Sequence, residues 1–342
     1  MTTINKTGMP RAMLINDLSC IGKCSLSVAL PIVSACGVEA VALPTVILST
    51  HTGGFEGFAA REMTEEMRTF AAHWRSIGVK FDCIYTGFFG SVEQINLTEK
   101  LIHDFGGDDT VVIVDPVLGD NGRLYPCFSD EYVEAMRRLT ALADVITPNL
   151  TEAAILAGLP FDTAPETILA RLNVPNVIIT GVRREGRIGY LSRFGGEKCE
   201  ISTPYVPLAL HGTGDVFASA FCGKLMADPQ RDMQLALAAA ADFCYGCVRE
   251  TVKRQPSHWY GLSFEDMLKK SLPLVREAAG AEGHLRRDRA AQHHGAHRPL
   301  RLRKIDLPQN AQPHERPCSG REDHRQRQVS RGGHICAGHG RQ

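Results

Sequence analysis

One short segment, His211-Gly-Thr-Gly-Asp215, holds residue types that could do chemistry at close spacing. Its two glycines allow the backbone N–H groups of residues 212–214 to turn towards one point, and the apolar residues that follow predict a helix whose N-terminus faces that point. We therefore expect an anion there. Asp215 would lie in the first turn of the helix, where its carboxylate could take a proton from a hydroxyl group beside the anion. The simplest reaction that uses both features is phosphoryl transfer from a nucleotide to an alcohol, and the plainer alternative is a tight turn with a helix cap.

The elements that must position this segment are predicted by apolar runs that alternate with helical segments. We expect helices over residues 25–35, 64–77 and 91–105, and strands over residues 13–15, 41–48, 83–85, 110–114, 144–147 and 177–180. The run 110–114 has no polar alternation, which is typical of a strand covered on both faces. This order predicts one α/β domain with a mostly parallel central sheet and helices on both faces.

Polar side chains gather at or near the ends of the expected strands. They are Asp17, Asp115, Asp120, Thr147, Asn149, Glu152 and Thr180. Because ligands of such sheets bind at the carboxyl ends of the strands, this clustering predicts a binding site there.

Charge and hydropathy exclude several classes of protein. The net charge is zero, but basic residues concentrate beyond residue 280, so that the main body is mildly acidic and gives no case for a nucleic-acid partner. The longest apolar stretch, residues 26–48, is interrupted by Pro31, Gly37, Glu39 and Pro44. A buried helix, a turn and a strand explain it better than a membrane span.

The eleven cysteines are scattered through apolar segments, and the N-terminus has no secretory pattern, so we expect a reducing cytoplasmic location. Cys20 with Cys24 and Cys244 with Cys247 have helical spacing. We interpret them as buried structural thiols rather than metal ligands.

Six segments, in this order and spacing, resemble the ribokinase superfamily and, within it, the pyridoxal kinase family, over about residues 10–276. They are Thr50-His-Thr-Gly53, Tyr85-Thr-Gly87, Asp115-Pro-Val-Leu-Gly-Asp120, Ile146-Thr-Pro-Asn149 with Glu152, Val177-Ile-Ile-Thr180 and Gly212-Thr-Gly-Asp215. The resemblance implies a ribokinase-like three-layer sandwich and phosphorylation of the 5′-hydroxymethyl group of a vitamin B6 compound (pyridoxal, pyridoxine or pyridoxamine) by ATP with Mg²⁺. It also suggests a homodimer.

The resemblance assigns a role to each candidate residue. Asp215 becomes the catalytic base, and the backbone amides of Gly212, Thr213 and Gly214 receive the transferred phosphoryl group. Asp115, Asp120 and Glu152 would organise Mg²⁺, directly or through water, and a monovalent cation such as K⁺ could join them. Thr147, Asn149 and Thr180 would line the triphosphate channel, and Asp17, His51 and Thr52 would face the pyridine ring. Tyr125 occupies a position where related kinases have a tyrosine on the nucleotide side, or it serves packing alone.

Three alternatives remain open. A hydroxymethylpyrimidine kinase of thiamine synthesis shares the Gly-Thr-Gly-Asp turn, but we would expect a more glycine-rich first loop than residues 17–22 provide. A sugar kinase would carry further polar residues for the sugar hydroxyls. A vitamin-binding protein without catalysis would have no need of Asp215. Asp17 stands where well-known pyridoxal kinases have serine, which leaves the exact form of the substrate open.

The sequence changes character after about residue 280. Residues 281–342 hold eight of the thirteen histidines, with thirteen Lys and Arg against six Asp and Glu. We expect a disordered, basic, His-rich tail. One permitted choice of codons for residues 299–317, read one base out of frame, encodes a peptide that resembles the Walker A region and following helix of an ABC transporter ATPase. We therefore expect the tail to be a frameshift product and residues 1–280 to form the kinase domain.

Overall fold

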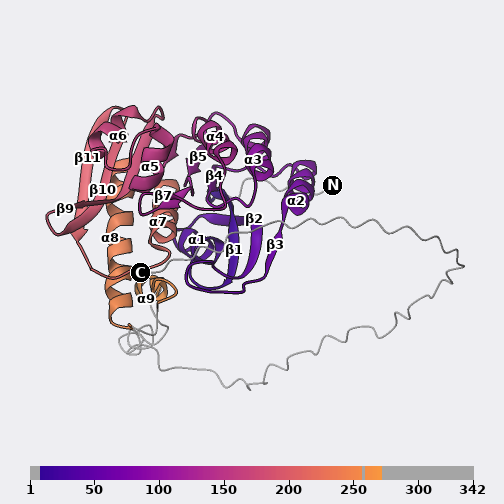
Figure 1. Ribbon diagram of the computed structural model, residues 1–342. Helices are drawn as coiled ribbons and strands as arrows, with labels where there is room; N and C mark the ends of the chain where they lie inside the picture. The colour runs from indigo at the N-terminus through magenta and orange to yellow at the C-terminus, as the bar shows by residue number, and fades with distance from the viewer. Residues whose placement is uncertain (1–7, 256–258, 272–342) are drawn as a thin grey trace, which may run out of the picture. The chain divides into compact units, whose positions relative to one another are not determined.

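A computed structural model describes residues 8–255 and 259–271 (Figure 1). Residues 281–342, for which we expect a disordered tail and a shifted reading frame, lie outside the described residues.

A nine-stranded sheet forms the centre of the described chain, in the order β11-β10-β9-β8-β5-β4-β1-β2-β3. The five pairings from β9 to β2 are parallel, whereas β3, β10 and β11 pair antiparallel at the two edges. The strands are β1 (Arg11–Ile21), β2 (Glu39–Thr50), β3 (Ala60–Glu62), β4 (Cys83–Thr86), β5 (Val111–Val114), β8 (Val145–Ile146), β9 (Asn176–Arg184), β10 (Arg187–Phe194) and β11 (Glu197–Pro204). A separate pair, β6 (Gly119–Asp120) and β7 (Arg123–Leu124), lies in the loop after β5.

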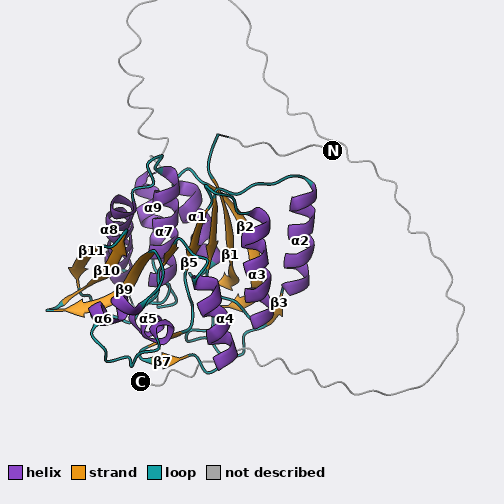
Figure 2. Ribbon diagram, turned by 90° about the horizontal axis from the view of Figure 1, so that it is seen from above, coloured by secondary structure: helices purple, strands orange, loops and turns teal. Residues whose placement is uncertain are grey.

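Helices cover both faces of this sheet, as Figure 2 shows. One apolar core joins the sheet to α2 (Thr64–Ser76), α3 (Val92–Phe105), α4 (Asp130–Thr140), α5 (Leu150–Ala157) and α6 (Pro165–Arg171). The other core joins it to α1 (Leu26–Ala35), α7 (Thr213–Ala227), α8 (Met233–Val252) and α9 (Phe264–Ser271). The predicted three-layer fold is thereby confirmed.

Local sequence explains where several helices begin. The hydroxyls of Ser91 and Ser129 accept backbone N–H groups at the starts of α3 and α4, which satisfies donors that have no partner within the helix. The strand β5 is buried at all four positions, as its apolar run predicts. Since the parallel strands end at one edge of the sheet, the loops after them meet there.

The structure also corrects three expectations. The first strand, expected over residues 13–15, runs from Arg11 to Ile21, with a register shift against β2 between Asn16 and Leu18. The edge strands β3, β10 and β11 were not predicted. Cys244 and Cys247 are buried in α8 as expected, but Cys20 lies exposed in β1, outside any helix.

Of the helices that the structure describes, none is both long and apolar enough to cross a membrane.

Candidate active site

The N-terminus of α7 is built on a left-handed glycine. Gly212 is the N-cap residue, with φ of 78°, and a Cβ atom there would lie 2.2 Å from the backbone oxygen of Lys23. Only glycine fits such a conformation and approach without a shift of the backbone. Gly214, in the first turn, faces open space, since a Cβ atom there would meet no atom within 4 Å. The first N–H groups of a helix have no partner within it, so the start of α7 suits an anion.

Asp215 lies in the first turn of α7 and is partly buried. Burial raises the pKa of its carboxyl group to about 7, and the nearby charge of Asp17 acts in the same direction. The backbone N–H of Ser25 and the side chain of Asn16 act in the opposite direction, because they hydrogen-bond to the charged form. A carboxylate with a pKa near neutrality can both take and release a proton at physiological pH.

Two further carboxylates lie near Asp215: that of Asp17 in β1 and that of Asp115 directly after β5. Asp17 of β1 is 5% exposed, and burial raises its pKa even though Ser25 and Ser19 hydrogen-bond to it. Asp115 follows β5, where its N–H donates to the Thr86 oxygen at 2.9 Å. Burial raises the pKa of Asp115 to about 8, and the charge of Asp215 adds to this effect. The structure thus brings Asp17 and Asp115, which the sequence placed near strand ends, close to Asp215 at the start of α7.

Glu152 is held by a capping box at the start of α5. The Asn149 side chain accepts from the Glu152 N–H at 2.9 Å, and Glu152 Oε2 accepts from the Asn149 N–H at 2.8 Å. Its other oxygen, Oε1, accepts from the Leu118 N–H at 3.2 Å. Burial is the main cause that raises the pKa of Glu152, and the negative charge of Asp115 raises it further. Most of the hydrogen-bonding capacity of this carboxylate is therefore already used within the protein.

The predicted nucleotide-side residues lie around this capping box. Asn149 donates through Nδ2 to the Gly119 oxygen at 2.8 Å, and it forms a parallel bridge with Thr180. The hydroxyl of Thr147 is buried and has no hydrogen-bond partner within residues 8–255 and 259–271, although it lies close enough to Asp115 to lower its pKa. A buried hydroxyl without a partner is a group that a ligand or water would satisfy.

Asp120 stands apart from the acids of the interior. It lies at the exposed end of β6, and its oxygens accept from the N–H and the side-chain amide of Asn121. Within the described residues, no group of three or more His, Cys, Asp or Glu side chains could hold a metal ion. The expected role of Asp115, Asp120 and Glu152 in organising Mg²⁺, directly or through water, stays a prediction. Both carboxylate oxygens of Glu152 accept backbone N–H groups, and the carboxylate of Asp120 accepts from its neighbour Asn121.

Aromatic rings cluster next to His211, which directly precedes the N-cap residue of α7. His51, 5% exposed, accepts from the Gly53 N–H through Nδ1 at 3.1 Å, and its Nε2 lies 2.9 Å from the Tyr260 oxygen. These contacts fit the neutral tautomer with the proton on Nε2. The ring lies 5.4 Å from His211 and 4.9 Å from Phe55, and burial lowers the pKa of both histidines. Thr52 follows in the same loop and is partly buried.

Comparison with known proteins assigns the fold and this constellation to a family. A sequence model described as phosphomethylpyrimidine kinase matches residues 30–261. Pyridoxal kinase PdxY of Rubrobacter xylanophilus is 31% identical over 246 residues, which are 64% of this chain and 79% of that protein. This chain belongs to the pyridoxal kinase family.

Two solved structures support the assignment. A Bacteroides thetaiotaomicron protein described as a phosphomethylpyrimidine kinase, in a crystal form with pyridoxal, is 35% identical, with a TM-score of 0.72, and the match covers 78% of this chain and 97% of that one. Pyridoxal kinase from Leishmania donovani, in complex with ADP and pyridoxamine, is 25% identical, with a TM-score of 0.67 and coverage of 76% and 95%. The chain is therefore a ribokinase-like phosphotransferase that acts on an alcohol group.

Several residues near the kinase's site were not singled out by the sequence. Asn16 and Ser25 lie close enough to Asp215 to lower the pKa of its carboxyl group. Phe55 packs against Trp259, with ring centroids 4.8 Å apart. No pattern marks these residues, because an Asn or Ser looks the same in a sequence whether or not a carboxylate lies beside it.

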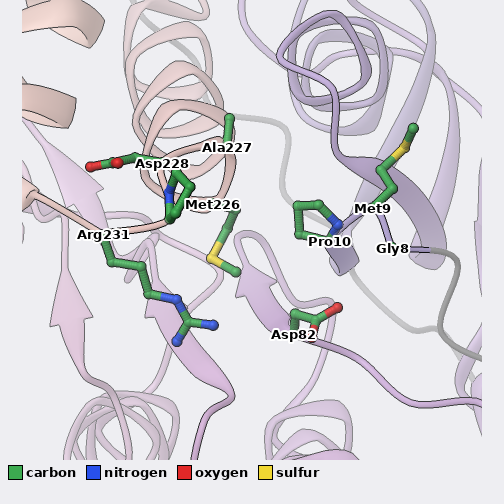
Figure 3. Close-up of a pocket in the computed structure, with 9 residues that line it drawn as sticks. Gly8, Met9, Pro10, Asp82, Met226, Ala227, Asp228 and Arg231 are labelled. Carbon is green, nitrogen blue, oxygen red and sulfur yellow. The ribbon is translucent and has the colours of Figure 1, made fainter.

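A hollow of about 410 Å³ in this kinase lies elsewhere (Figure 3). Its lining comes from Pro10 before β1, Asp82 before β4, and Met226 to Asp228 at the end of α7, together with Arg231. These residues mark the amino ends of the parallel strands, opposite to the edge that holds Asp215. The hollow is therefore separate from the candidate active site.

Proposed function

We propose that this kinase transfers the γ-phosphoryl group of ATP to the 5′-hydroxymethyl group of a B6 vitamer, with Asp215 as the general base. The observation that carries the proposal is the placement of a carboxyl group of pKa about 7 beside the glycine turn at the N-terminus of α7. Relatives of this fold with bound pyridoxal, and with ADP and pyridoxamine, support the two substrates.

The chain's own groups account for the steps. Asp215 accepts the hydroxyl proton as the substrate oxygen forms its bond to phosphorus and the bond to the ADP oxygen breaks. The N–H groups of residues 212–214 and the dipole of α7 face the phosphoryl group, whose negative charge they stabilise. Thr147 and Asn149 follow β8, and Thr180 in β9 bridges Asn149; these three residues would line the triphosphate side. Asp17, His51 and Thr52 border the vitamer ring, and Tyr125 lies near the acids on the nucleotide side.

A cation fits the charge of this site. Asp115 lies near both Asp215 and Glu152, and within the described part of the chain no lysine or arginine forms an ion pair with any of the three. Buried acids that lack a cationic partner suit a hard divalent ion. We propose that Asp115 holds Mg²⁺ together with ATP phosphates and water, while Asp120 and Glu152 act through water, and that K⁺ could bind nearby. Mg²⁺ would supply neutralisation of the phosphate charge.

Other expectations stay proposals. We infer that the kinase acts as a homodimer in the cytoplasm, without nucleic acid, and that residues 281–342 are dispensable. The mildly acidic main body and the family membership support them.

A hydroxymethylpyrimidine substrate is the second candidate, because the matching family model is described as phosphomethylpyrimidine kinase. Release of ADP should therefore be measured in parallel with pyridoxal, pyridoxamine, pyridoxine and hydroxymethylpyrimidine, with a sugar as the control. We expect the highest kcat/KM with a B6 vitamer. A clear preference for hydroxymethylpyrimidine would transfer the assignment to the second candidate, and no turnover with any alcohol would favour a binding protein.

A further inference from the structure

Two histidine rings lie next to each other where the loop after β2 meets the start of α7. The ring centroids of His51 and His211 are 5.4 Å apart, and Gly53 lies against both rings. A Cβ atom on Gly53 would lie 2.8 Å from Nδ1 and Cε1 of His211 and 3.5 Å from Nδ1 of His51. Position 53 therefore needs a glycine for His211 to keep its place.

His51 has both of its ring nitrogens bonded to the backbone. Nδ1 accepts from the Gly53 N–H at 3.1 Å, and Nε2 donates to the Tyr260 oxygen at 2.9 Å. The Cδ2 edge of the ring faces Gly22, where a Cβ atom would lie only 2.1 Å away. An imidazole has no further polar atom, so His51 keeps no hydrogen-bonding group for a substrate. It can offer a vitamer only the surface of its ring.

His211 differs from His51 in this respect. Within residues 8–255 and 259–271, neither of its ring nitrogens has a hydrogen-bond partner, although the residue is partly buried. The Nδ1–Cε1 edge lies against Gly53, which leaves Nε2 outside that contact. Burial lowers the pKa of His211, although the charge of Asp120 acts against it, and a neutral imidazole carries one N–H donor. A partly buried donor without a partner can serve a bound ligand.

The place of His211 in the chain indicates which ligand atoms it meets. It directly precedes Gly212, the N-cap residue of α7, and the start of that helix is where we expect the phosphoryl group. Its ring packs on the loop of residues 51–53, which we expect to border the vitamer. The alcohol and the phosphoryl group that it receives must meet between these two segments. His211 joins them.

We propose that His211 is a further catalytic residue, and that its Nε2–H donates a hydrogen bond to an oxygen of the transferred phosphoryl group. The inference rests on the proposed phosphorylation of a vitamer alcohol. In that step the vitamer oxygen forms its bond to phosphorus, the bond from phosphorus to the ADP oxygen breaks, and the hydroxyl proton passes to Asp215. His211 keeps its proton throughout, and His51 fixes the loop against which His211 packs.

The first test is His211→Leu, which removes the donor. We expect kcat to fall about 100-fold, because a hydrogen bond to charge that develops in the transition state is lost. The KM values for ATP and vitamer should stay within about threefold of wild type. His211→Gln, whose amide can place an N–H near the former Nε2, should have a kcat between those of His211→Leu and wild type. His103→Leu is the matched control, because His103 is exposed in the last turn of α3, and it should keep wild-type kinetics.

Binding of a transition-state mimic separates a lost contact from general damage. The affinity for ADP with aluminium fluoride and pyridoxal, measured by calorimetry, should fall in His211→Leu by about the same factor as kcat. The affinity for ATP alone should stay within about threefold of wild type. A wild-type kcat for folded His211→Leu, or a loss confined to the KM for the vitamer, would overturn the inference.

Gly53→Ala displaces the His211 ring without removing it. The new Cβ atom would lie 2.8 Å from the ring, so we expect a loss of kcat in this variant and little further loss when it is combined with His211→Leu. Should His211→Leu not fold, a wild-type kcat for Gly53→Ala would overturn the inference. A fully active Asp215→Asn variant would instead refute Asp215 as the base, without restoring the activity of His211→Leu.

Discussion

The substitution Asp115→Asn tests whether a buried acid beside Asp215, the proposed base, weakens the fold as pH rises. In the folded chain the pKa of Asp115 is about 8, raised mainly by burial. In the unfolded chain it lies near the ordinary value of about 3.9. Between these limits the folded state keeps a proton that the unfolded state has released, so the free energy of unfolding decreases as pH rises.

The size of the effect follows from the same pKa values. One such group lowers the free energy of unfolding by about 1.4 kcal/mol per pH unit, or by about 2.7 kcal/mol between pH 5 and pH 7. Asp215, with its pKa raised to about 7, also lowers the free energy of unfolding as pH rises, but it does so in wild type and variant alike. Because the enzyme is tested without a cation, and because neighbouring groups relax, we expect wild type to lose about 1–3 kcal/mol more than Asp115→Asn over this range.

Urea unfolding at pH 5, 6 and 7, in a chelator and without nucleotide, measures the difference. Asp120→Asn is the matched control, because it removes an exposed carboxylate of the same loop and should lose stability in parallel with wild type. Equal losses for wild type and Asp115→Asn would refute the reasoning that this acid is buried without a cationic partner.

Four further predictions follow from the site. Asp215→Asn should lower kcat by about 100- to 10,000-fold while ATP binding, measured by calorimetry, is kept; unchanged turnover would contradict the role of base. In wild type, kcat/KM should rise with pH through about 7, because Asp215 must lose its proton to act, and a profile flat from pH 5 to 9 would argue against this. Gly212→Ala should destabilise the turn by about 1–3 kcal/mol and reduce kcat, because the new Cβ meets the Lys23 oxygen, whereas Gly214→Ala has room and should fold as wild type, as thermal unfolding would show. Truncation after residue 280 should leave kcat unchanged, and a large loss would show that the tail contributes.

Much of the fold followed from the sequence because its signals are local. The β-branched run before Asp115 predicts β5, and the two glycines before Asp215 predict the turn into α7. The antiparallel strands β10 and β11 did not follow, since their half-buried pattern depends on pairing with the distant β9. Strand pairing of this kind is decided by tertiary contacts rather than by propensity.

The candidate site, like the fold, could be predicted from the sequence only in part. Strand ends predicted where Asp115 and Asn149 would lie, whereas Thr180 lies inside β9, which continues to Arg184. The spacing of Asn149 and Glu152 could have predicted the capping box, because that pattern is local. The sequence could not show that Glu152 Oε1 also accepts from Leu118 in a separate loop, or that the side chain of Asp120 is exposed. The roles of these residues in nucleotide and metal binding stay predictions.

The close approach of Lys23 to Gly212 joins two loops that are almost 190 residues apart in the chain. Their evolution is therefore tied: a change that moves one backbone by an ångström must be answered in the other. Efforts to redirect this kinase to a new alcohol should therefore vary both loops together and leave residue 212 unchanged. Substitutions in one loop alone would displace the backbone N–H groups at the N-terminus of α7.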